Sequence, residues 1–598
     1  MFPFNRRHNA FPHVVGMSPW IFFSLLLVGC GSGSNSSSAP PSVAATGTPG
    51  AQGDVGERLF VETRFAQFFK ANLPPGGNVN APLPAGDPVV ANVLLPGSTP
   101  PGVASPFVGM SMNCRSCHFV DEFVGVPGGS MRTYTDFAVR SPIPSRPDGK
   151  LTAPRNSPPL VNASLNRPGG TLFHFDGEFS TLEDLIVGTF TGRNFGWLPG
   201  QKAEAIRHIA RVLREDDGKG AIAQQFDGLP YGTLFTGAHP DIPDELRLPP
   251  EFRVFVQSAS DQEVFDAVVK VVAAYVNGLR FSQSDDAGNL IRSPFDVFLS
   301  RNGLPQQPNS GETPLDYSRR LLTLVNGLAS PQFVTRNPNN PSLNGNFQFH
   351  GPQPFVFGAQ ELAGLKIFLT EPAIPPTASP AEEVAGKVGN CLACHAAPNF
   401  TDFKLHNTGV AQREYDDPAV GTGHAAGSFA ALIIPRLIPD PILVLPARTA
   451  NDLPATEDHP GASERFRSIP TAGTTLTDLG VWNIFLNPDM PNPQAKIKAI
   501  LCEEHLPGAC PADDVLLDEA IARFKTPGLR DLGHSAPYMH NGQFVALDNA
   551  VGFYLGSSIA ARAGTLRNGA KALQGIALIQ ADIAPLVAFL KSLNEDYQ

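Results

Sequence analysis

Charged residues are scarce in this sequence, and positive charge is scarcer than negative charge. Asp, Glu, Lys and Arg make up 17% of the 598 residues, and the formal net charge is −11. No stretch is rich enough in Lys and Arg to form a phosphate-binding patch, which argues against nucleic acid as a partner. The hydrophobic content of 42%, with 41 Phe, excludes disorder throughout the chain.

The length allows about three to five folding units at ~100–200 residues per domain. Gly and Pro are abundant, with 57 and 59 residues respectively. Because both residues interrupt helices and strands, we expect short elements joined by long irregular loops.

Long apolar runs are missing beyond the N-terminus. Arg6 and Arg7 precede the apolar stretch 20–28, which is shorter than the ~20 residues that span a bilayer, so residues 1–29 are predicted to be a signal peptide. The stretch ends in Leu-Val-Gly-Cys30, which resembles the lipobox of bacterial lipoproteins. An ordinary secreted protein with a stray Cys30 is the alternative.

The segment after this cysteine is rich in Gly, Ser, Ala and Pro and has no apolar periodicity, so residues 30–53 are predicted to be a lipidated flexible tether. We therefore expect an exported protein, periplasmic or at the cell surface, that is anchored to a membrane through lipid. Gly31, rather than Asp, follows Cys30, which by resemblance favours the outer membrane.

Cysteine is also scarce, with seven residues, and four of them form two C-x-x-C-H motifs: Cys114, Cys117 and His118, and Cys391, Cys394 and His395. This pattern is the attachment signature of c-type heme. The two thiols form thioethers with the heme vinyl groups, and the adjacent His reaches the iron as proximal ligand. Chance alone gives roughly 0.002 such motifs in a chain of this composition. Zinc ligands or redox dithiols are the competing interpretation, which export of the chain makes weaker. The sequence therefore predicts two covalently bound c-type hemes.

The remaining pair, Cys502 and Cys510, is predicted to form a disulfide in an oxidising compartment. Closing so short a loop contributes about 2.5 kcal/mol on the chain-entropy model. A free thiol pair is the alternative. His505 is the only neighbour that would favour a thiolate, so the disulfide is the preferred interpretation.

The domain organisation follows from the two motifs and from two similar helical patterns. Residues 264–279 have apolar side chains at helical spacing, and the ending AAYVNGL is matched by VAFLKSL near the C-terminus. Each looks like the closing helix of a cytochrome c domain. We predict a mainly α fold with two heme domains, at 54–285 and 355–598, joined by a linker or insertion at 286–354.

Several short runs resemble the bacterial diheme cytochrome c peroxidase and MauG superfamily. They are GLKIF before CLACH, NFTD at 399–402, HNTG at 406–409, FKTPGLR at 524–530 and SAPYMHNG at 535–542. The resemblance is dense over about 355–598. In the N-terminal part it rests on CRSCH, RNSPPLVN at 155–162, FHFDG at 173–177 and TLED at 181–184. The segments near 215–260 and 285–350 have no counterpart that we identify.

The resemblance implies a second axial ligand for the C-terminal heme, 14 residues after the His of the A-P-Y-x-H run. Counted from His540, this position is Tyr554, as in MauG, whereas the peroxidases have Met there. An anionic tyrosinate favours ferric iron, so a low-potential second heme is expected. A core aromatic role for Tyr554 is the alternative, and Met539 is the nearest rival ligand.

The superfamily also holds a calcium ion between its hemes. The matching positions are Asn156, Ser535 and Pro537, whose amide and carbonyl oxygens suit a hard cation. Asn156 is equally suited to a turn before Pro158.

The first heme departs from the peroxidase pattern. No His lies between His118 and His174, so the usual distal His is missing and an open sixth position is expected. Phe175, Leu185 and Phe195 stand where the family has Trp, Gln and Glu. The absence of that Glu weakens a plain peroxidase interpretation, because a carboxylate there would shuttle the proton.

An apolar distal pocket resembles the rubber oxygenases, a branch of the superfamily with Phe over the open heme. Phe190 or Phe195 is the candidate, and both are equally well explained as core residues. His174 with Glu178 is the candidate for the missing acid–base function.

The resemblance implies a diheme oxidoreductase that reduces hydrogen peroxide, or activates peroxide or O₂, at the heme of His118. Electrons would pass through the second heme from a periplasmic donor or an oxidisable substrate. The alternatives are a heme dioxygenase acting on a hydrophobic substrate and a pure electron-transfer cytochrome.

Overall fold

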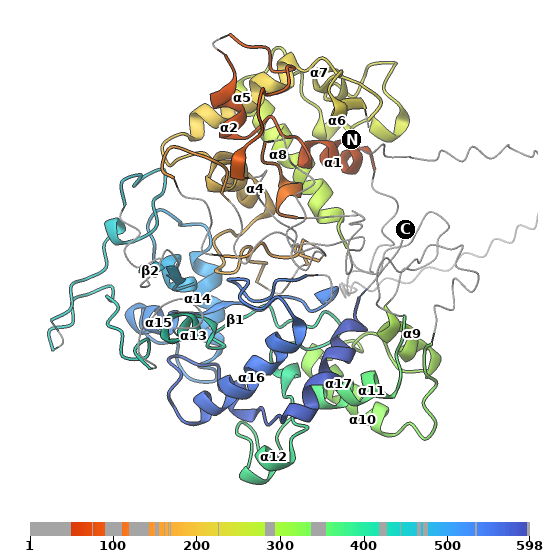
Figure 1. Cartoon of the computed structure of the whole chain (residues 1–598), viewed down its shortest axis with the longest axis vertical. Coiled ribbons are helices and arrows are strands. Elements are labelled where there is room, and N and C mark those ends of the chain that lie inside the picture. Colours follow the sequence, from red (N-terminus) through yellow and green to blue (C-terminus); the bar gives the residue numbers. More distant parts are fainter. Residues whose placement is uncertain are drawn as a thin grey trace, which may run out of the picture. The chain divides into compact units, whose positions relative to one another are not determined.

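Helices carry nearly all the regular structure in the computed structural model of this chain (Figure 1). The structure describes residues 50–89, 111–118, 143–149, 155–280, 293–335, 355–417, 427–462, 468–470 and 476–594, apart from positions 75, 161, 166, 168, 225, 443, 533 and 534. The strands within these ranges form two small antiparallel pairs. Their bounds are β1 Leu405–His406 with β4 Phe524–Lys525, and β2 Ser468–Pro470 with β3 Leu476–Asp478. The mainly α prediction is therefore confirmed.

The first hydrophobic cluster lies entirely between Val55 and Leu279. Its principal helices are α1 (Ala51–Phe60), α2 (Gln67–Asn72), α4 (Leu182–Thr191), α5 (Lys202–Glu215), α7 (Tyr231–Leu234) and α8 (Asp261–Gly278). The segment 215–260, which has no family counterpart, contributes fully buried Tyr231 and Phe235 to this core. It is therefore an integral part of the first core.

Helix α8 shows why its sequence folds as predicted. Ser260 begins it with a capping box, in which the Ser260 hydroxyl accepts from the Glu263 amide (3.2 Å) and the Glu263 carboxylate accepts from the Ser260 amide (2.8 Å). Such a cap stabilises a helix by about 1 kcal/mol. Val264, Val268 and Val271 recur at helical spacing and are all buried, so the predicted helix at 264–279 is confirmed.

The second cluster combines the C-terminal helices with two helices of the predicted linker. Its helices are α9 (Pro294–Arg301), α10 (Pro314–Asn326), α11 (Ala359–Leu369), α16 (Leu547–Arg562) and α17 (Gln580–Lys591). Arg530 joins α9 to the C-terminal part through a buried two-pronged ion pair with Asp296, at 2.7 and 3.0 Å. The segment 293–335 thus packs with the C-terminal core, whereas the predicted domain boundaries stay a prediction.

A third cluster is built from residues 405–522 together with Leu172. Its helices are α13 (Val410–Asp416), α14 (Gln494–Glu503) and α15 (Asp513–Glu519), around fully buried Trp482. Cys502 near the end of α14 is bonded to Cys510, so the predicted disulfide is confirmed. The short helix α12 (Pro380–Ala385) lies outside these three clusters.

Two pairs of helices cross at a glycine, α1 with α8 in the first cluster and α11 with α17 in the second. Gly56 on α1 lies so close to α8 that an added Cβ would stand 2.6 Å from Tyr275 Cβ and 2.7 Å from the Val271 carbonyl oxygen. At the crossing of α11 and α17, a Cβ on Gly364 would be only 1.9 Å from the carbonyl oxygen of Pro585. Only glycine fits at either crossing, since any side chain would force the helices apart. The first and second clusters therefore each contain a helix crossing that only glycine allows.

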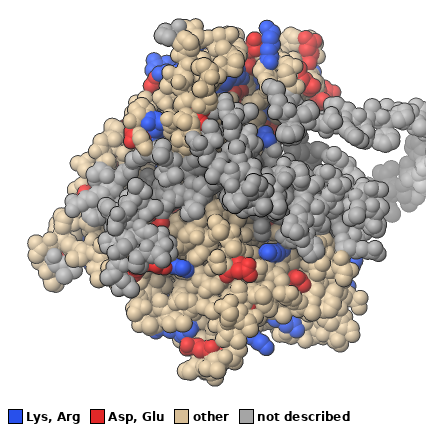
Figure 2. Space-filling model, viewed as in Figure 1, with Lys and Arg blue, Asp and Glu red and all other residues tan. Residues whose placement is uncertain are grey.

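Charge is sparse on the visible face of the molecule, where Lys, Arg, Asp and Glu are scattered among uncharged residues (Figure 2). Among the described helices, none combines the length and the apolar character that a bilayer-crossing segment needs. The predicted signal peptide at 1–29, Cys30 and most of the tether lie outside the described residues.

Candidate heme sites and the wall between them

The first C-x-x-C-H motif forms a single 3₁₀ turn, η1 (Cys114–Ser116), and not a full α-helical turn. The Asn113 side chain holds it at both sides: Oδ1 accepts from the Ser116 amide (2.9 Å), and Nδ2 donates to the Val61 carbonyl after α1 (2.7 Å). The His118 amide donates to the Cys114 carbonyl at 2.9 Å. This turn places Cys114 and His118 together at the edge of one cavity.

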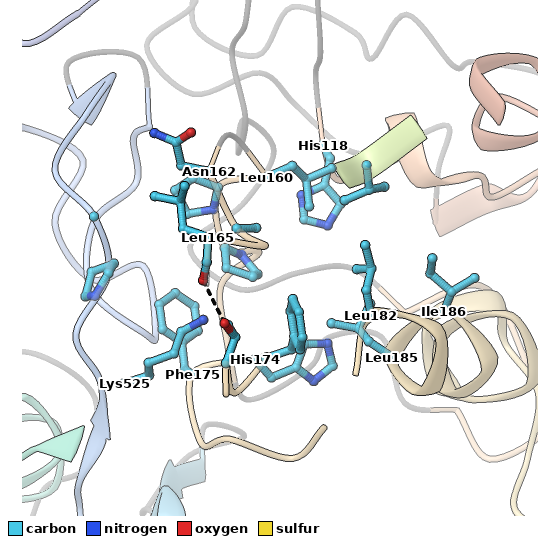
Figure 3. Close-up of a pocket in the computed structure, with 18 of the residues that line it drawn as sticks. His118, Leu160, Asn162, Leu165, His174, Phe175, Leu182, Leu185, Ile186 and Lys525 are labelled. Carbon is cyan, nitrogen blue, oxygen red and sulfur yellow. Dashed lines mark hydrogen bonds between the residues drawn. The ribbon is translucent and has the colours of Figure 1, made fainter. Parts of the chain in front are cut away.

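This first cavity measures about 1240 Å³, with the open space at its mouth included. Apolar side chains of α4 form one wall, and His118 and His174 lie on facing sides (Figure 3). The described lining residues are mostly aliphatic or aromatic, including Phe60, Leu160, Leu165, Phe173, Leu182, Leu185, Ile186, Phe190, Val272 and Val276. The cavity is therefore an apolar space with one predicted heme-ligating His at its edge.

His174 is held rigidly in a tight hairpin. The flanking residues Phe173 and Phe179 pair with each other, and the Phe173 amide donates to the Phe179 carbonyl at 2.8 Å. Nδ1 of His174 lies 2.9 Å from the Glu178 carboxylate, and the ring packs edge-on against Phe179. His174 adopts φ of +61°, a conformation that a non-glycine residue rarely takes outside functional or strained sites. Since Nδ1 is engaged, Nε2 is the ring atom left to act on a ligand.

The acidic groups beside His174 are neutralised by arginines. His174, Asp176 and Glu178 have possible ligand atoms within 4.8 Å of one another, a spacing that a metal ion also accepts. Arg155 contacts Asp176 at 2.6 Å and also pairs with Asp478, while Arg193 lies 3.6 Å from Glu178. Guanidinium groups supply here the positive charge that a metal would bring, so the cluster is an ion-pair network.

The two phenylalanines predicted for the distal pocket have different positions. Phe190 lines the first cavity and is fully buried. Phe195 is also buried, packing edge-on against Phe190 with ring centroids 5.0 Å apart, but it is not among the described lining residues. Phe190 is therefore the better candidate for contact with a ligand.

The second C-x-x-C-H motif forms the same 3₁₀ turn, η5 (Cys391–Ala393), and the His395 amide donates to the Cys391 carbonyl at 2.7 Å. Nδ1 of His395 lies 2.8 Å from the Phe400 carbonyl oxygen. Because a carbonyl only accepts, Nδ1 carries the proton, and Nε2 keeps the lone pair that a metal needs. Burial lowers the pKa of His395, which favours this neutral ring.

The second cavity surrounds His395 and measures about 1580 Å³, with the open space at its mouth included. Tyr554 from α16 and Met539 both line it, so the predicted axial ligand and its rival share one cavity with Cys391, Cys394 and His395. Burial raises the pKa of the Tyr554 phenol well above its ordinary value, and the neighbouring cysteines raise it further. The phenol is therefore neutral by itself, and becoming a tyrosinate ligand requires a metal ion to displace its proton.

Both cavities fit a covalently attached heme. Each is mainly apolar, with a Cys of the motif and the adjacent His in its wall. Desolvation raises the pKa of Cys117 and of Cys391 to about 12, whereas redox-active dithiols have lowered values. The raised pKa values of these two thiols argue against redox-dithiol chemistry.

The three predicted calcium ligands come together although they lie almost 400 positions apart in the sequence. Asn156, Ser535 and Pro537 all line the second cavity, and Asn156 Nδ2 donates to the Pro537 carbonyl at 2.5 Å. The Asn156 amide also donates to the His540 carbonyl at 2.7 Å. These amide and carbonyl oxygens are hard, uncharged ligands of the kind that calcium binds. The calcium ion itself stays a prediction.

A shared wall separates the two cavities. The described residues that line both are Pro159, Phe175, Lys525, Thr526, Pro527 and Gly528. Phe175, which stands where the family has an inter-heme Trp, therefore lies between the two sites. Lys525 was not identified from the sequence as a site residue, because a lone Lys in a motif gives no signal of burial.

No family model matches this chain. A cytochrome-c peroxidase, IdrP1, of Denitromonas iodatirespirans is 36% identical over 74 residues, which is 12% of this chain and 18% of that protein. The cytochrome-c peroxidase IdrP2 of Pseudomonas sp. (strain SCT) is 26% identical over 211 residues, 35% of this chain and 37% of that protein. The matched segments thus cover well under half the length of these relatives.

Two solved structures also match. One is a MauG-like protein associated with microbial copper homeostasis, with a TM-score of 0.39 and 14% identity over 91% of this chain and 89% of that chain. The other is the diheme peroxidase BthA of Burkholderia thailandensis, with a TM-score of 0.40 and 16% identity over 91% and 86%. The sequence matches to the cytochrome-c peroxidases confirm the resemblance of this chain to the bacterial diheme cytochrome c peroxidase and MauG superfamily.

Proposed function

We propose that this protein is a diheme c-type cytochrome oxidoreductase of the peroxidase type. The observation that carries the proposal is that each C-x-x-C-H motif borders its own apolar cavity, and that the two cavities are lined by different candidate ligands. The second contains Tyr554 and Met539, whereas no Tyr or Met is among the described residues lining the first. Sequence similarity to proteins named cytochrome-c peroxidase supports the same reaction class.

The roles of the residues follow from their positions. When bound, heme would supply an iron that takes up peroxide or O₂ at the first site and exchanges electrons at the second. His118 would be the proximal ligand of the open first heme, and His395 and Tyr554 would hold the second heme closed. A calcium ion at Asn156, Ser535 and Pro537 would fix the loop between the sites.

His174 gives the first cavity a group that moves protons. Reduction of hydrogen peroxide requires a base that takes a proton from one oxygen and returns it to the other as the O–O bond breaks. Nε2 of His174 is suited to accept it, because Nδ1 is held by Glu178 and the ring is fixed in the hairpin. The Glu178 carboxylate stabilises the resulting positive charge. Electrons for complete reduction of the peroxide would come from a periplasmic donor or an oxidisable substrate.

A heme dioxygenase acting on a hydrophobic substrate is the second candidate. The apolar lining of the first cavity favours it, with Phe190 in the position to contact a ligand. In that case Phe190→Ala changes the affinity for an apolar substrate, whereas Phe195→Ala does not, because Phe195 stands behind Phe190. Thermal unfolding of both variants controls for the loss of buried aromatic area.

We also propose that the protein is exported and anchored to a membrane, in the periplasm or at the cell surface. The support is sequence-based: the short apolar segment before Cys30 and the Gly- and Ser-rich residues 30–53. Metabolic labelling with a fatty acid tests it. Label is expected in the wild type and absent from Cys30→Ala, and label in both would contradict the anchor site.

One titration separates the functions. The oxidised and the reduced protein are each titrated with hydrogen peroxide, O₂ and cyanide while absorption and paramagnetic resonance are recorded. Peroxide turnover with cyanide binding at one heme supports a peroxidase, and a stable O₂ complex without peroxide turnover supports the oxygenase. Two six-coordinate hemes that bind no added ligand would leave a pure electron-transfer cytochrome and refute the proposal. His118→Ala is expected to abolish ligand binding at the first site.

A further inference from the structure

The wall between the two cavities contains one charged side chain. Of the six described residues that line both cavities, five are Pro, Phe, Thr or Gly, and the sixth is Lys525. Among the described residues lining the second cavity, it is the only Lys, Arg, Asp or Glu. A cation placed here acts on both sites at once.

The ammonium group of Lys525 has more hydrogen-bonding capacity than its neighbours use. Nζ donates to the Leu172 carbonyl at 2.9 Å and lies 5.9 Å from the centre of the Phe173 ring. An ammonium has three N–H donors, and in the described part of the chain Lys525 has no carboxylate within ion-pair distance. Arg530, the other cation lining the first cavity, is by contrast engaged by both oxygens of Asp296.

An ammonium group that is partly withdrawn from water and has no anion beside it is energetically unfavourable. The lowered pKa of Lys525 reflects this cost. Desolvation lowers the pKa of Lys525 to about 8, and Asp176 opposes this. A half-buried cation without a bonded carboxylate is completed when a negative group binds beside it.

The backbone of Lys525 is fixed, which makes its position well defined. It lies on β4, in register with Leu405 of β1, and its amide donates to the Phe175 carbonyl at 2.6 Å. The side chain lies beside Phe175 at the edge of the first cavity (Figure 3). Lys525 is thus a positioned group and not a mobile surface lysine.

We propose that Lys525 is a carboxylate-binding residue shared by the two cavities, whose ammonium binds the acidic side groups of the tetrapyrroles held there. The inference rests on the proposed function, because it requires both hemes. Lys525 is a positioning and electrostatic residue: it holds one positive charge between the two redox centres. A nearby positive charge stabilises the reduced state of iron, since reduction lowers the positive charge of the centre.

The test uses the full-length holoprotein and compares two variants with a matched control. Lys525→Met removes the charge and keeps the length of the side chain, while Lys525→Arg keeps the charge. Lys496→Met is the control, because Lys496 is also half-buried, also donates to a backbone carbonyl, that of Ser180 at 2.9 Å, and lines neither cavity. The readout is the reduction potential of each heme in a spectroelectrochemical titration, with thermal unfolding recorded in parallel.

In Lys525→Met, the ratio of reduced to oxidised heme at a fixed ambient potential is expected to fall by about tenfold at both sites. Lys525→Arg restores most of the shift, and Lys496→Met leaves both potentials unchanged. Unchanged potentials in Lys525→Met, a shift at one heme only, or an equal shift in Lys496→Met would each overturn the inference. If the wild type carries two hemes but binds no peroxide or O₂, the proposed function fails while this test still stands.

Discussion

The two cavities begin from the same five-residue motif and become different sites. Each motif folds as one 3₁₀ turn, with the amide of the final His bonded to the carbonyl of the first Cys. The opposite walls differ: helix α4 brings Leu and Ile to the first cavity, and α16 brings Tyr554 to the second. In the proposed function, the motif would attach the heme, whereas a helix from another part of the chain would decide whether its iron can bind an outside ligand.

A His–carboxylate pair is found at both cavities. His174 lines the first cavity, and its Nδ1 lies 2.9 Å from the Glu178 carboxylate. His406 lines the second cavity, and its Nε2 lies 2.7 Å from the Asp402 carboxylate. Such a pair therefore does not distinguish the two sites, whereas the Tyr554 phenol, which lines only the second cavity, does.

The comparison is tested most strongly by removing one motif at a time. The double variant Cys391→Ala with Cys394→Ala is expected to keep one covalent heme that still binds cyanide. The double variant Cys114→Ala with Cys117→Ala should keep one heme that does not. Heme content per chain is measured by the pyridine hemochrome spectrum and by intact mass. Two hemes retained in either variant would contradict the attachment sites.

Tyr554→Phe should convert the closed site into an open one. Without the phenolate, the second heme is expected to lose its ferric-stabilising ligand, to gain a higher reduction potential and to bind cyanide. The matched control is Tyr538→Phe, because Tyr538 lines the same cavity and is not at the predicted ligand position. Paramagnetic resonance of the ferric protein is the measurement. An unchanged spectrum in Tyr554→Phe would assign the sixth position to another residue, with Met539 next to be replaced.

His174→Gln should weaken the first site alone. Loss of a positioned proton acceptor typically slows a reaction by about 10²-fold. We expect this decrease in peroxide-dependent turnover and a slower association of cyanide, with the second heme unchanged. Glu178→Gln is expected to show a smaller decrease, about tenfold, since it removes only the partner of Nδ1.

The control for that experiment is His239→Gln, which replaces a half-exposed His that lines neither cavity. Equal rates in His174→Gln and His239→Gln would show that protons leave the first cavity by another route.

The repeated helix crossing gives the smallest expected effect. Gly364→Ala and Gly56→Ala insert a methyl group against Pro585 and Tyr275 and should lower the free energy of unfolding by about 1–3 kcal/mol each. Gly552→Ala on α16 is the matched control, because no atom lies within 4 Å of its Cβ position and a stabilisation of about 1 kcal/mol is expected. Denaturant unfolding measures all three. If the two crossing variants behave like Gly552→Ala, the helices are not in close contact there.

Much of the fold was predictable because its signals are local. The helix at 264–279 is marked by regularly spaced valines and by the Ser260 cap, and the disulfide joins two cysteines only eight positions apart. The role of residues 293–335 was missed, because packing of α9 against the C-terminal core depends on the distant Arg530.

The candidate sites divide in the same way. Cys114, Cys117, His118, Cys391, Cys394 and His395 are recognisable from spacing alone, because heme attachment needs them within five consecutive positions. Tyr554 and Asn156 required a resemblance to a family, and the structure then brought each to the second cavity. No sequence pattern predicted Lys525 as a site residue, since its role depends on its position between the two cavities.

The sequence by itself determined the two predicted heme-attachment motifs, because thioether formation and proximal ligation would use residues that are neighbours along the chain. Only the tertiary structure decided which groups face each motif. Phe190 and Tyr554 line different cavities because α4 borders the first and α16 the second. Phe175 and Lys525 lie between the sites because the Lys525 amide on β4 donates to the Phe175 carbonyl in the hairpin of residues 173–179. Such contacts join positions hundreds of residues apart, and no local pattern records them.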